Sequence, residues 1–115
     1  MLSAAAIATI AAAGAIAPAA SIEVTPAHVA RGQSVRVHGS AGDCERGDVV
    51  TLLSPAFVRT HQFAGVAAVS ALVSSTGSFS VRTRIPATRR AGRYVIAGRC
   101  GGGNLGVSAT LHVLR

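Results

Sequence analysis

The stretch that decides the fold is Gly92-Arg-Tyr-Val-Ile-Ala-Gly-Arg-Cys100, near the end of the chain. Alternate side chains of a strand point to the same face. The more apolar set, which ends in a cysteine, is Tyr94, Ile96, Gly98 and Cys100. The opposite set, which carries two arginines, is Arg93, Val95, Ala97 and Arg99. The pattern predicts a strand with one face toward the core.

Stretches on both sides of this strand alternate in the same way. Val35 and Val37 are predicted to face the core, with Arg36 and His38 outward. The other predicted inward sets are Val50 and Leu52; Phe79, Val81 and Ile85; and Ala109, Leu111 and Val113. The segment 22–25 alternates and is closed by Pro26, which is typical of an edge strand.

Turn-forming residues separate these stretches. Ser75-Thr-Gly77-Ser predicts a tight hairpin, and Gly101-Gly-Gly-Asn104 predicts another. The apolar segment 63–75 between strands predicts one longer strand or two short ones, and a helix is the alternative. The chain therefore contains about seven short strands in roughly 95 residues, a spacing that predicts an all-β antiparallel sandwich.

The first 20 residues have the features of a helical secretory signal peptide. Residues 2–17 are uncharged and mostly apolar, and Ala17-Pro-Ala19 supplies an A-x-A cleavage pattern. Cleavage after Ala19 or Ala20 would leave a single domain at 21–115, secreted or associated with the cell wall. The segment has no Lys or Arg near its start, and an uncleaved membrane anchor is the alternative.

The charge balance is strongly basic, at +7, from eleven arginines, no lysine and four acids. The densest cluster is Arg82, Arg84, Arg89, Arg90 and Arg93. Such a cluster is a candidate site for anionic polysaccharide or phospholipid headgroups. Nucleic acid is not expected, because no outward aromatic side chain accompanies the arginines. The alternative is a solvated surface whose arginines follow from the amino-acid usage of a G+C-rich genome.

Several pieces of the chain carry a family resemblance. They are Val24-Thr-Pro26, Gly32-Gln-Ser-Val-Arg-Val-His-Gly-Ser40, Gly77-Ser-Phe-Ser-Val81, Ile85-Pro86 and Ala91-Gly-Arg-Tyr-Val95. Over roughly residues 22–114 the chain resembles the bacterial immunoglobulin-like domains of small secreted actinobacterial proteins. The resemblance implies a seven-strand immunoglobulin-like sandwich and no particular activity. Two departures from antibody domains are the lack of Trp and the position of Tyr94, six residues before Cys100 rather than two.

Cys44 and Cys100 are the two cysteines of the chain. An even count together with an export signal predicts a disulfide between them, and the same pairing recurs in the family that the chain resembles. A redox pair and a thiolate metal site remain the alternatives, although neither has a C-x-x-C spacing.

Other chemistry-bearing residues form no catalytic pattern. Asp43, Glu45 and Asp48 offer oxygen ligands for Ca²⁺, but solvated loop acids are the competing interpretation. Gly101–Gly103 lacks the Lys-Ser/Thr of a phosphate loop. The histidines are scattered, at His28, His38, His61 and His112.

We therefore expect no enzyme, cofactor or metal. The sequence favours a secreted, non-enzymatic immunoglobulin-like module with a structural or binding role at the cell surface. The alternative is an exported basic protein that binds anionic polysaccharide or a membrane surface through its arginines.

Overall fold

Nine strands and no helix occupy residues 19–115, the part of the chain that the computed structural model describes. The strands are β1 (Glu23–Thr25), β2 (His28–Ala30), β3 (Ser34–Ser40), β4 (Val49–Leu53), β5 (Gln62–Phe63), β6 (Val66–Leu72), β7 (Ser78–Arg84), β8 (Gly92–Cys100) and β9 (Gly103–Leu114). The predicted signal peptide lies outside the described residues, apart from its last two positions. Within the described part, no helix is long and apolar enough to cross a membrane.

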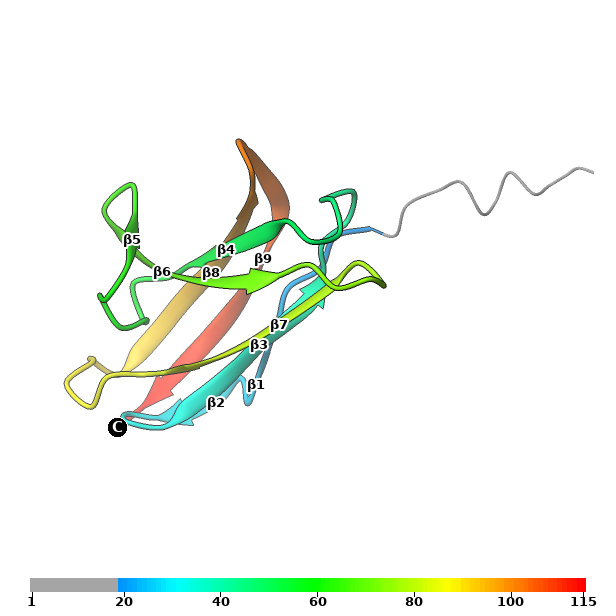
Figure 1. The fold of residues 1–115 in the computed structure, drawn as a ribbon. Coiled ribbons are helices and arrows are strands. Elements are labelled where there is room, and N and C mark those ends of the chain that lie inside the picture. The colour runs from blue at the N-terminus through cyan, green and yellow to red at the C-terminus, as the bar shows by residue number, and fades with distance from the viewer. Residues whose placement is uncertain (1–18) are drawn as a thin grey trace, which may run out of the picture.

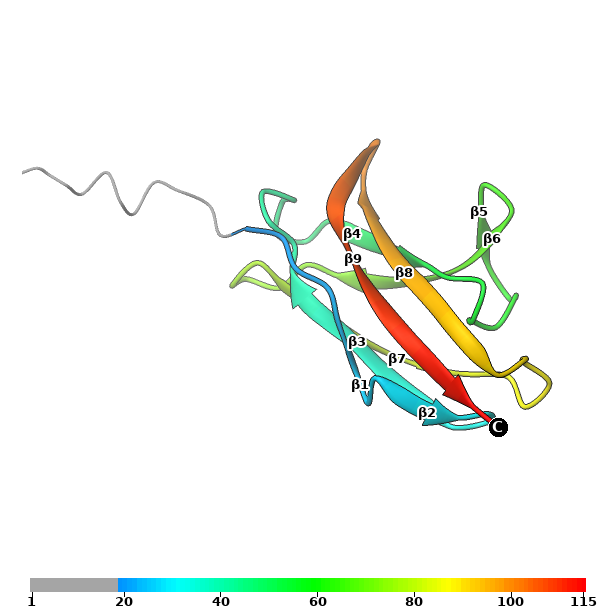
Figure 2. The ribbon, with the colours of Figure 1, turned by 180° about the vertical axis from the view of Figure 1, so that it is seen from behind.

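The strands form two facing sheets, as Figures 1 and 2 show from opposite sides. One sheet has three strands in the order β1-β3-β7, and the other has six in the order β2-β9-β8-β4-β6-β5. The prediction of an all-β sandwich-like fold is confirmed. The predicted count of seven strands is wrong, because the very short β2 and β5 carry too few residues to show an alternating pattern.

The prediction of a wholly antiparallel arrangement is also wrong, because β2 runs parallel to β9. The chain leaves the three-stranded sheet at Pro26, which lacks the N–H that would continue the β1 ladder. It then enters the other sheet, where the Ala27 carbonyl accepts the His112 N–H at 2.8 Å. The predicted edge strand before Pro26 is therefore real but short, and a second edge strand follows it.

The core lies between the sheets and is built from the predicted inward residues. Val35, Val37, Val50 and Leu52 are fully buried, as are Ile85, Ile96 and Leu111. Two further core residues, Ala56 and Phe57, come from the irregular segment after β4. Sequence periodicity does not reveal them, because they lie in a loop that folds back against the core.

The strand predicted over Gly92–Cys100 begins and ends where β8 does. Ile96 and Gly98 are buried, whereas Arg93, Val95 and Ala97 are exposed. A Cβ at Gly98 would lie 2.8 Å from Leu105 Cδ1 and 3.1 Å from Ile22 Cδ1. Neighbouring side chains therefore fill the space above this glycine, and β8 packs closely against the first residues of the domain.

The apolar segment after residue 62 forms strands, and the helix alternative is wrong. β5 and β6 make a short hairpin with Ala64 and Gly65 at its turn, both at positive φ. The following turn closes as predicted, because Gly77 N–H donates to Ser74 O at 3.0 Å. However, the strands that it joins, β6 and β7, belong to different sheets, so this turn is a crossover between sheets and not a hairpin.

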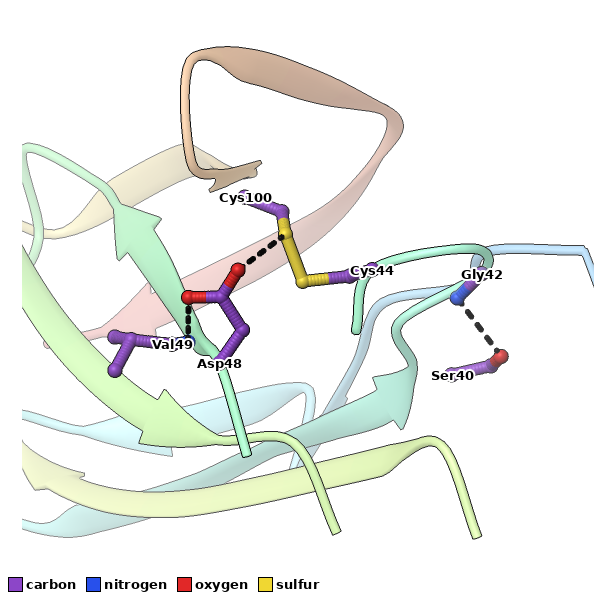
Figure 3. The surroundings of a disulfide bond; sticks show 6 residues. All are labelled: Ser40, Gly42, Cys44, Asp48, Val49 and Cys100. Carbon is purple, nitrogen blue, oxygen red and sulfur yellow. Dashed lines mark hydrogen bonds between the residues drawn. A yellow bond between two sulfur atoms is a disulfide. The ribbon is translucent and has the colours of Figure 1, made fainter. Parts of the chain in front are cut away.

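The predicted disulfide joins Cys44, in the β3–β4 loop, to Cys100 at the end of β8, with 6.0 Å between the Cα atoms. Figure 3 shows Asp48 beside it, with its Oδ2 3.9 Å from Cys100 Sγ. Because a disulfide sulfur carries no hydrogen, this approach is a packing contact. The other carboxylate oxygen accepts the Val49 N–H at 2.8 Å, at the start of β4. The disulfide thus ties a loop from the three-stranded sheet to the six-stranded sheet.

Candidate functional site

The arginines of β7 lie on the outer face of the three-stranded sheet. Arg82 and Arg84 are exposed, as the alternation of β7 predicts. The β3–β7 register places Arg36 directly opposite Arg82. Two like charges at opposed positions repel each other and destabilise the sheet. Sequence reasoning left Arg36 out of the cluster because it comes from a strand more than 40 residues away.

Arg89 has a structural role. Its Nε donates to Ala56 O at 3.3 Å, and its Nη2 donates to Phe57 O at 3.0 Å. These two carbonyls belong to the loop that delivers Phe57 to the core. Arg89 therefore holds the loop after β4 against the loop before β8, and two of its guanidinium nitrogens are already bonded within the chain.

The remaining predicted arginines gather with others at one end of the sandwich. Arg90 and Arg93 are exposed where the chain enters β8. The β2–β3 turn lies at the same end, since Arg84 Nε donates to Gly32 O at 3.0 Å. Six arginines lie at this end, which we call the basic end: Arg31, Arg84, Arg89, Arg90, Arg93 and Arg115. Arg115 lies near Arg31, because the residues before them, Leu114 and Ala30, are paired in the β2–β9 register.

The acids lie toward the opposite end. β3 begins beside Arg84 and ends at Ser40, and the loop that follows carries Asp43, Glu45 and Asp48. The fourth acid, Glu23, pairs across the sheet with His38, nearer the disulfide. The charges are therefore segregated along the strands, with every acid of the chain away from the basic end.

Few of these charges are neutralised by partners. Among residues 19–115 the ion pair found joins His38 Nδ1 to Glu23 Oε1, 3.9 Å apart, and no arginine takes part in one. Unpaired cations that share one surface produce a positive potential that attracts anions over about a Debye length, about 8 Å at physiological salt. The basic end can therefore bind an anionic partner, and high salt would weaken that binding.

The other candidate residues are not assembled for chemistry. Asp48 lies near Cys44 and Cys100, but disulfide sulfurs are not thiolate ligands, so this group does not make a metal site. His38 and His112 lie in different sheets. His112 instead stacks on His28, with ring centroids 4.4 Å apart. Sequence reasoning missed this contact because it depends on the parallel β2–β9 pair.

An apolar hollow of about 360 Å³ lies on the outer face of the six-stranded sheet. Its walls include Val95 and Phe63, and the guanidinium of Arg99 lies 5.0 Å from the centre of the Phe63 ring. The chain itself already binds that guanidinium, because Nη1 donates to Asn104 Oδ1 at 2.8 Å and Nη2 to Gly102 O at 3.2 Å. Arg99 is thus held in place and is distinct from the exposed arginines of the basic end.

No protein-family model matches the chain, and no curated protein matches it. Among solved structures it is similar to the alkylpurine DNA glycosylase AlkC of Pseudomonas fluorescens, solved on DNA with an abasic site analog. The TM-score is 0.55 and the identity 18%, over 87% of this chain but 30% of that one. It is also similar to BslA, a bacterial hydrophobin, with a TM-score of 0.56 and 10% identity over 83% of this chain and 98% of that one. At these identities the likeness concerns the fold alone.

Proposed function

We propose that this chain is a non-enzymatic, immunoglobulin-like binding module, of the kind carried by secreted actinobacterial proteins. It acts outside the cytoplasm, at the cell surface or beyond, and binds anionic polysaccharide through its basic end. The observation that carries this proposal is the gathering of five exposed arginines, beside the half-buried Arg89, at the end of the sandwich that holds none of the acids.

Three features support the immunoglobulin-like assignment. The neighbours β9-β8-β4 match the G, F and C strands of an immunoglobulin sheet, β6 extends that sheet beside β4, and β1-β3-β7 matches the A, B and E strands of the other sheet. The Tyr94 hydroxyl donates to Arg90 O at 2.7 Å, back across the β7–β8 corner, as in the tyrosine corner of such domains. The disulfide, between the loop after β3 and the end of β8, matches the pairing that recurs in the bacterial domains that the chain resembles. It also supports an oxidising compartment, since disulfides persist mainly outside the cytoplasm.

Anionic polysaccharide fits the basic end better than other polyanions do. At the basic end, the β3–β7 register places Ser34 opposite Arg84, and the hydroxyl of a serine can hydrogen-bond to sugars and acidic groups. Nucleic acid binding normally adds aromatic side chains on which bases stack. Tyr94, at the start of β8, is half-buried and its hydroxyl is already bonded, and Phe57 is fully buried.

Retention of the full domain on an immobilised carboxylated or sulfated polysaccharide tests the proposal. Wild type should bind at low salt and elute as salt screens the arginines. Arg90→Glu should weaken binding at least tenfold, because an arginine near an anionic surface contributes about 1 kcal/mol and the reversal also adds repulsion.

Arg46→Glu is the matched control. Arg46 lies in the acidic β3–β4 loop, and this variant has the same net charge as Arg90→Glu. Equal loss in both variants would mean that only net charge matters and would refute a site at the basic end. Stronger binding to anionic vesicles than to polysaccharide would reassign the partner to a membrane surface.

A further inference from the structure

The three-stranded sheet has one long open edge, at β7. The strand pairs with β3 on one side and, among residues 19–115, with no strand on the other. The other edge strands are much shorter: β1 and β2 have three residues each and β5 has two, whereas β7 has seven. A long edge exposes a row of unpaired N–H and C=O groups that a further strand can bind.

Hydrogen bonds at its two ends show which backbone groups face the open side. Ile85 N–H donates to Gln33 O at 2.9 Å, so the Ile85 backbone faces β3. Ser78 O accepts the Ser74 N–H at 2.8 Å, so the Ser78 backbone faces away from β3. Backbone direction alternates along an antiparallel strand. The N–H and C=O groups of Ser80, Arg82 and Arg84 therefore point to the open edge.

The side chains beside this edge define what would pair with it. Arg82 and Arg84 lie on the outer face, where Arg36 adds a third positive charge opposite Arg82. On the inner face, Val81 and Thr83 remain only partly buried, so the core is incompletely covered there. A strand added to β7 would place alternate side chains beside the arginines and the others beside Val81 and Thr83.

A second copy of this chain is a poor occupant of the edge. Antiparallel pairing of β7 with β7 would set Arg82 and Arg84 of one copy against the same arginines of the other. Like charges at opposed positions destabilise a sheet, and charged edge residues are a common protection against self-association. A strand with acidic side chains would instead gain cross-strand ion pairs and neutralise the Arg36–Arg82 repulsion.

We propose that β7 is a docking edge for a protein partner, which adds one extended strand whose acidic and apolar side chains alternate. Main-chain bonds to Ser80, Arg82 and Arg84 supply affinity, and the arginines select the acidic pattern. This site shares Arg84 with the basic end but differs from the proposed polysaccharide contact, because it depends on backbone groups of the edge and not on Arg90 or Arg93.

The experiment adds a labelled ten-residue peptide of alternating Glu and Val to the full domain. Fluorescence anisotropy should show binding, and amide hydrogen exchange should show new protection at Ser80 and Arg82. A Lys/Val peptide of the same pattern should bind at least tenfold more weakly. Binding without protection at these two amides, or equal binding of both peptides, would overturn the proposal. So would a wild-type dimer that buries β7.

Two variants at Ser80 form a matched pair. Ser80→Pro removes a single N–H on the open side, where an edge strand tolerates proline, and should reduce peptide binding at least tenfold. Ser80→Ala keeps that N–H and loses the same hydroxyl contact to Arg36, so it should bind as wild type does. Equal peptide binding by Ser80→Pro, shown by circular dichroism to be folded, would refute the site.

The same variants separate this proposal from the polysaccharide function. Ser80→Pro should be retained on polysaccharide like wild type, and Arg90→Glu should bind the peptide like wild type. If Arg90→Glu alone lost the peptide, the binding would be general charge attraction, and the strand-addition proposal would be refuted.

Discussion

At the scale of single residues, the Tyr94 hydroxyl holds the corner where the chain passes from one sheet to the other. It donates to Arg90 O at 2.7 Å while its ring packs against the core. The sequence predicted that the ring faces the core, and the alternation of β8 confirms it. The hydrogen bond was not predictable, because its acceptor is a backbone carbonyl in a loop without regular pattern.

Tyr94→Phe removes that hydroxyl and leaves the ring in place. We expect the free energy of unfolding to fall by about 1 kcal/mol, the usual net contribution of one such hydrogen bond. Denaturant unfolding measures the change, with Thr110→Val as a control that removes an exposed hydroxyl from β9. A Tyr94→Phe domain as stable as wild type would show that the corner does not depend on this bond.

Two neighbouring arginines at the same corner should behave differently. Arg89→Ala loses charge-assisted bonds to Ala56 O and Phe57 O, and we expect a loss of about 1–2 kcal/mol of stability, since the group is half-exposed. Arg90→Ala removes an exposed side chain and should stay within about 0.5 kcal/mol of wild type. Equal stabilities of the two variants in urea would contradict the structural role of Arg89.

At the scale of elements, a close crossing near the start of the domain constrains β3. A Cβ at Gly39 would lie 2.0 Å from Ser21 O, which is a backbone atom that cannot turn aside. The Ser21 N–H also donates to Ser40 O at 3.0 Å, so the two segments are bonded next to the crossing. Sequence patterns do not reveal this constraint on Gly39, because the close contact depends on a segment 18 residues earlier.

Gly39→Ala should therefore separate the first residues of the domain from β3. We expect a destabilisation of about 3 kcal/mol, at the upper end of the range for overpacking, because the clash is with backbone. Gly102→Ala, where a Cβ meets nothing within 4 Å, is the matched control. Thermal unfolding compares the two variants, and a Gly39→Ala midpoint equal to that of the control would contradict the contact.

The length and alternation of a strand decided whether the sequence predicted it. β3, β7 and β8 have seven to nine residues with clear alternation, and their inward side chains were assigned correctly. β2 and β5 are too short to show a period, and the sheet that each strand joins depends on contacts far along the chain. The Ser75–Ser78 turn illustrates this limit, because its local signal does not distinguish a hairpin from a crossover.

At the scale of the whole molecule, the distribution of charge matters more than the net value of +7. The clustering of Arg82 to Arg93 was evident in the sequence, but the separation of all four acids from that end was not. It arises because β3 and β7 run the length of the sandwich, so that Arg84 and the acidic loop after Ser40 lie at opposite ends. The structure also shows that Arg89 is half-buried, and it adds the exposed Arg31 and Arg115 to that end, whereas Arg36 lies beside Arg82 on the three-stranded sheet.

The disulfide acts on the whole molecule, because it joins the β3–β4 loop to the end of β8 across a sequence separation of 56 residues. Closing a loop of that size in the unfolded chain corresponds to about 4 kcal/mol, a large share of the roughly 5–15 kcal/mol that stabilises a typical domain.

We therefore expect reductant to lower the free energy of unfolding by about 4 kcal/mol, measured by urea denaturation with and without reductant. The Cys44→Ser/Cys100→Ser double variant is the control, and its stability should match that of the reduced wild type and not respond to reductant. A fully reduced wild type with an unchanged midpoint would mean that the two sheets hold together without the covalent link.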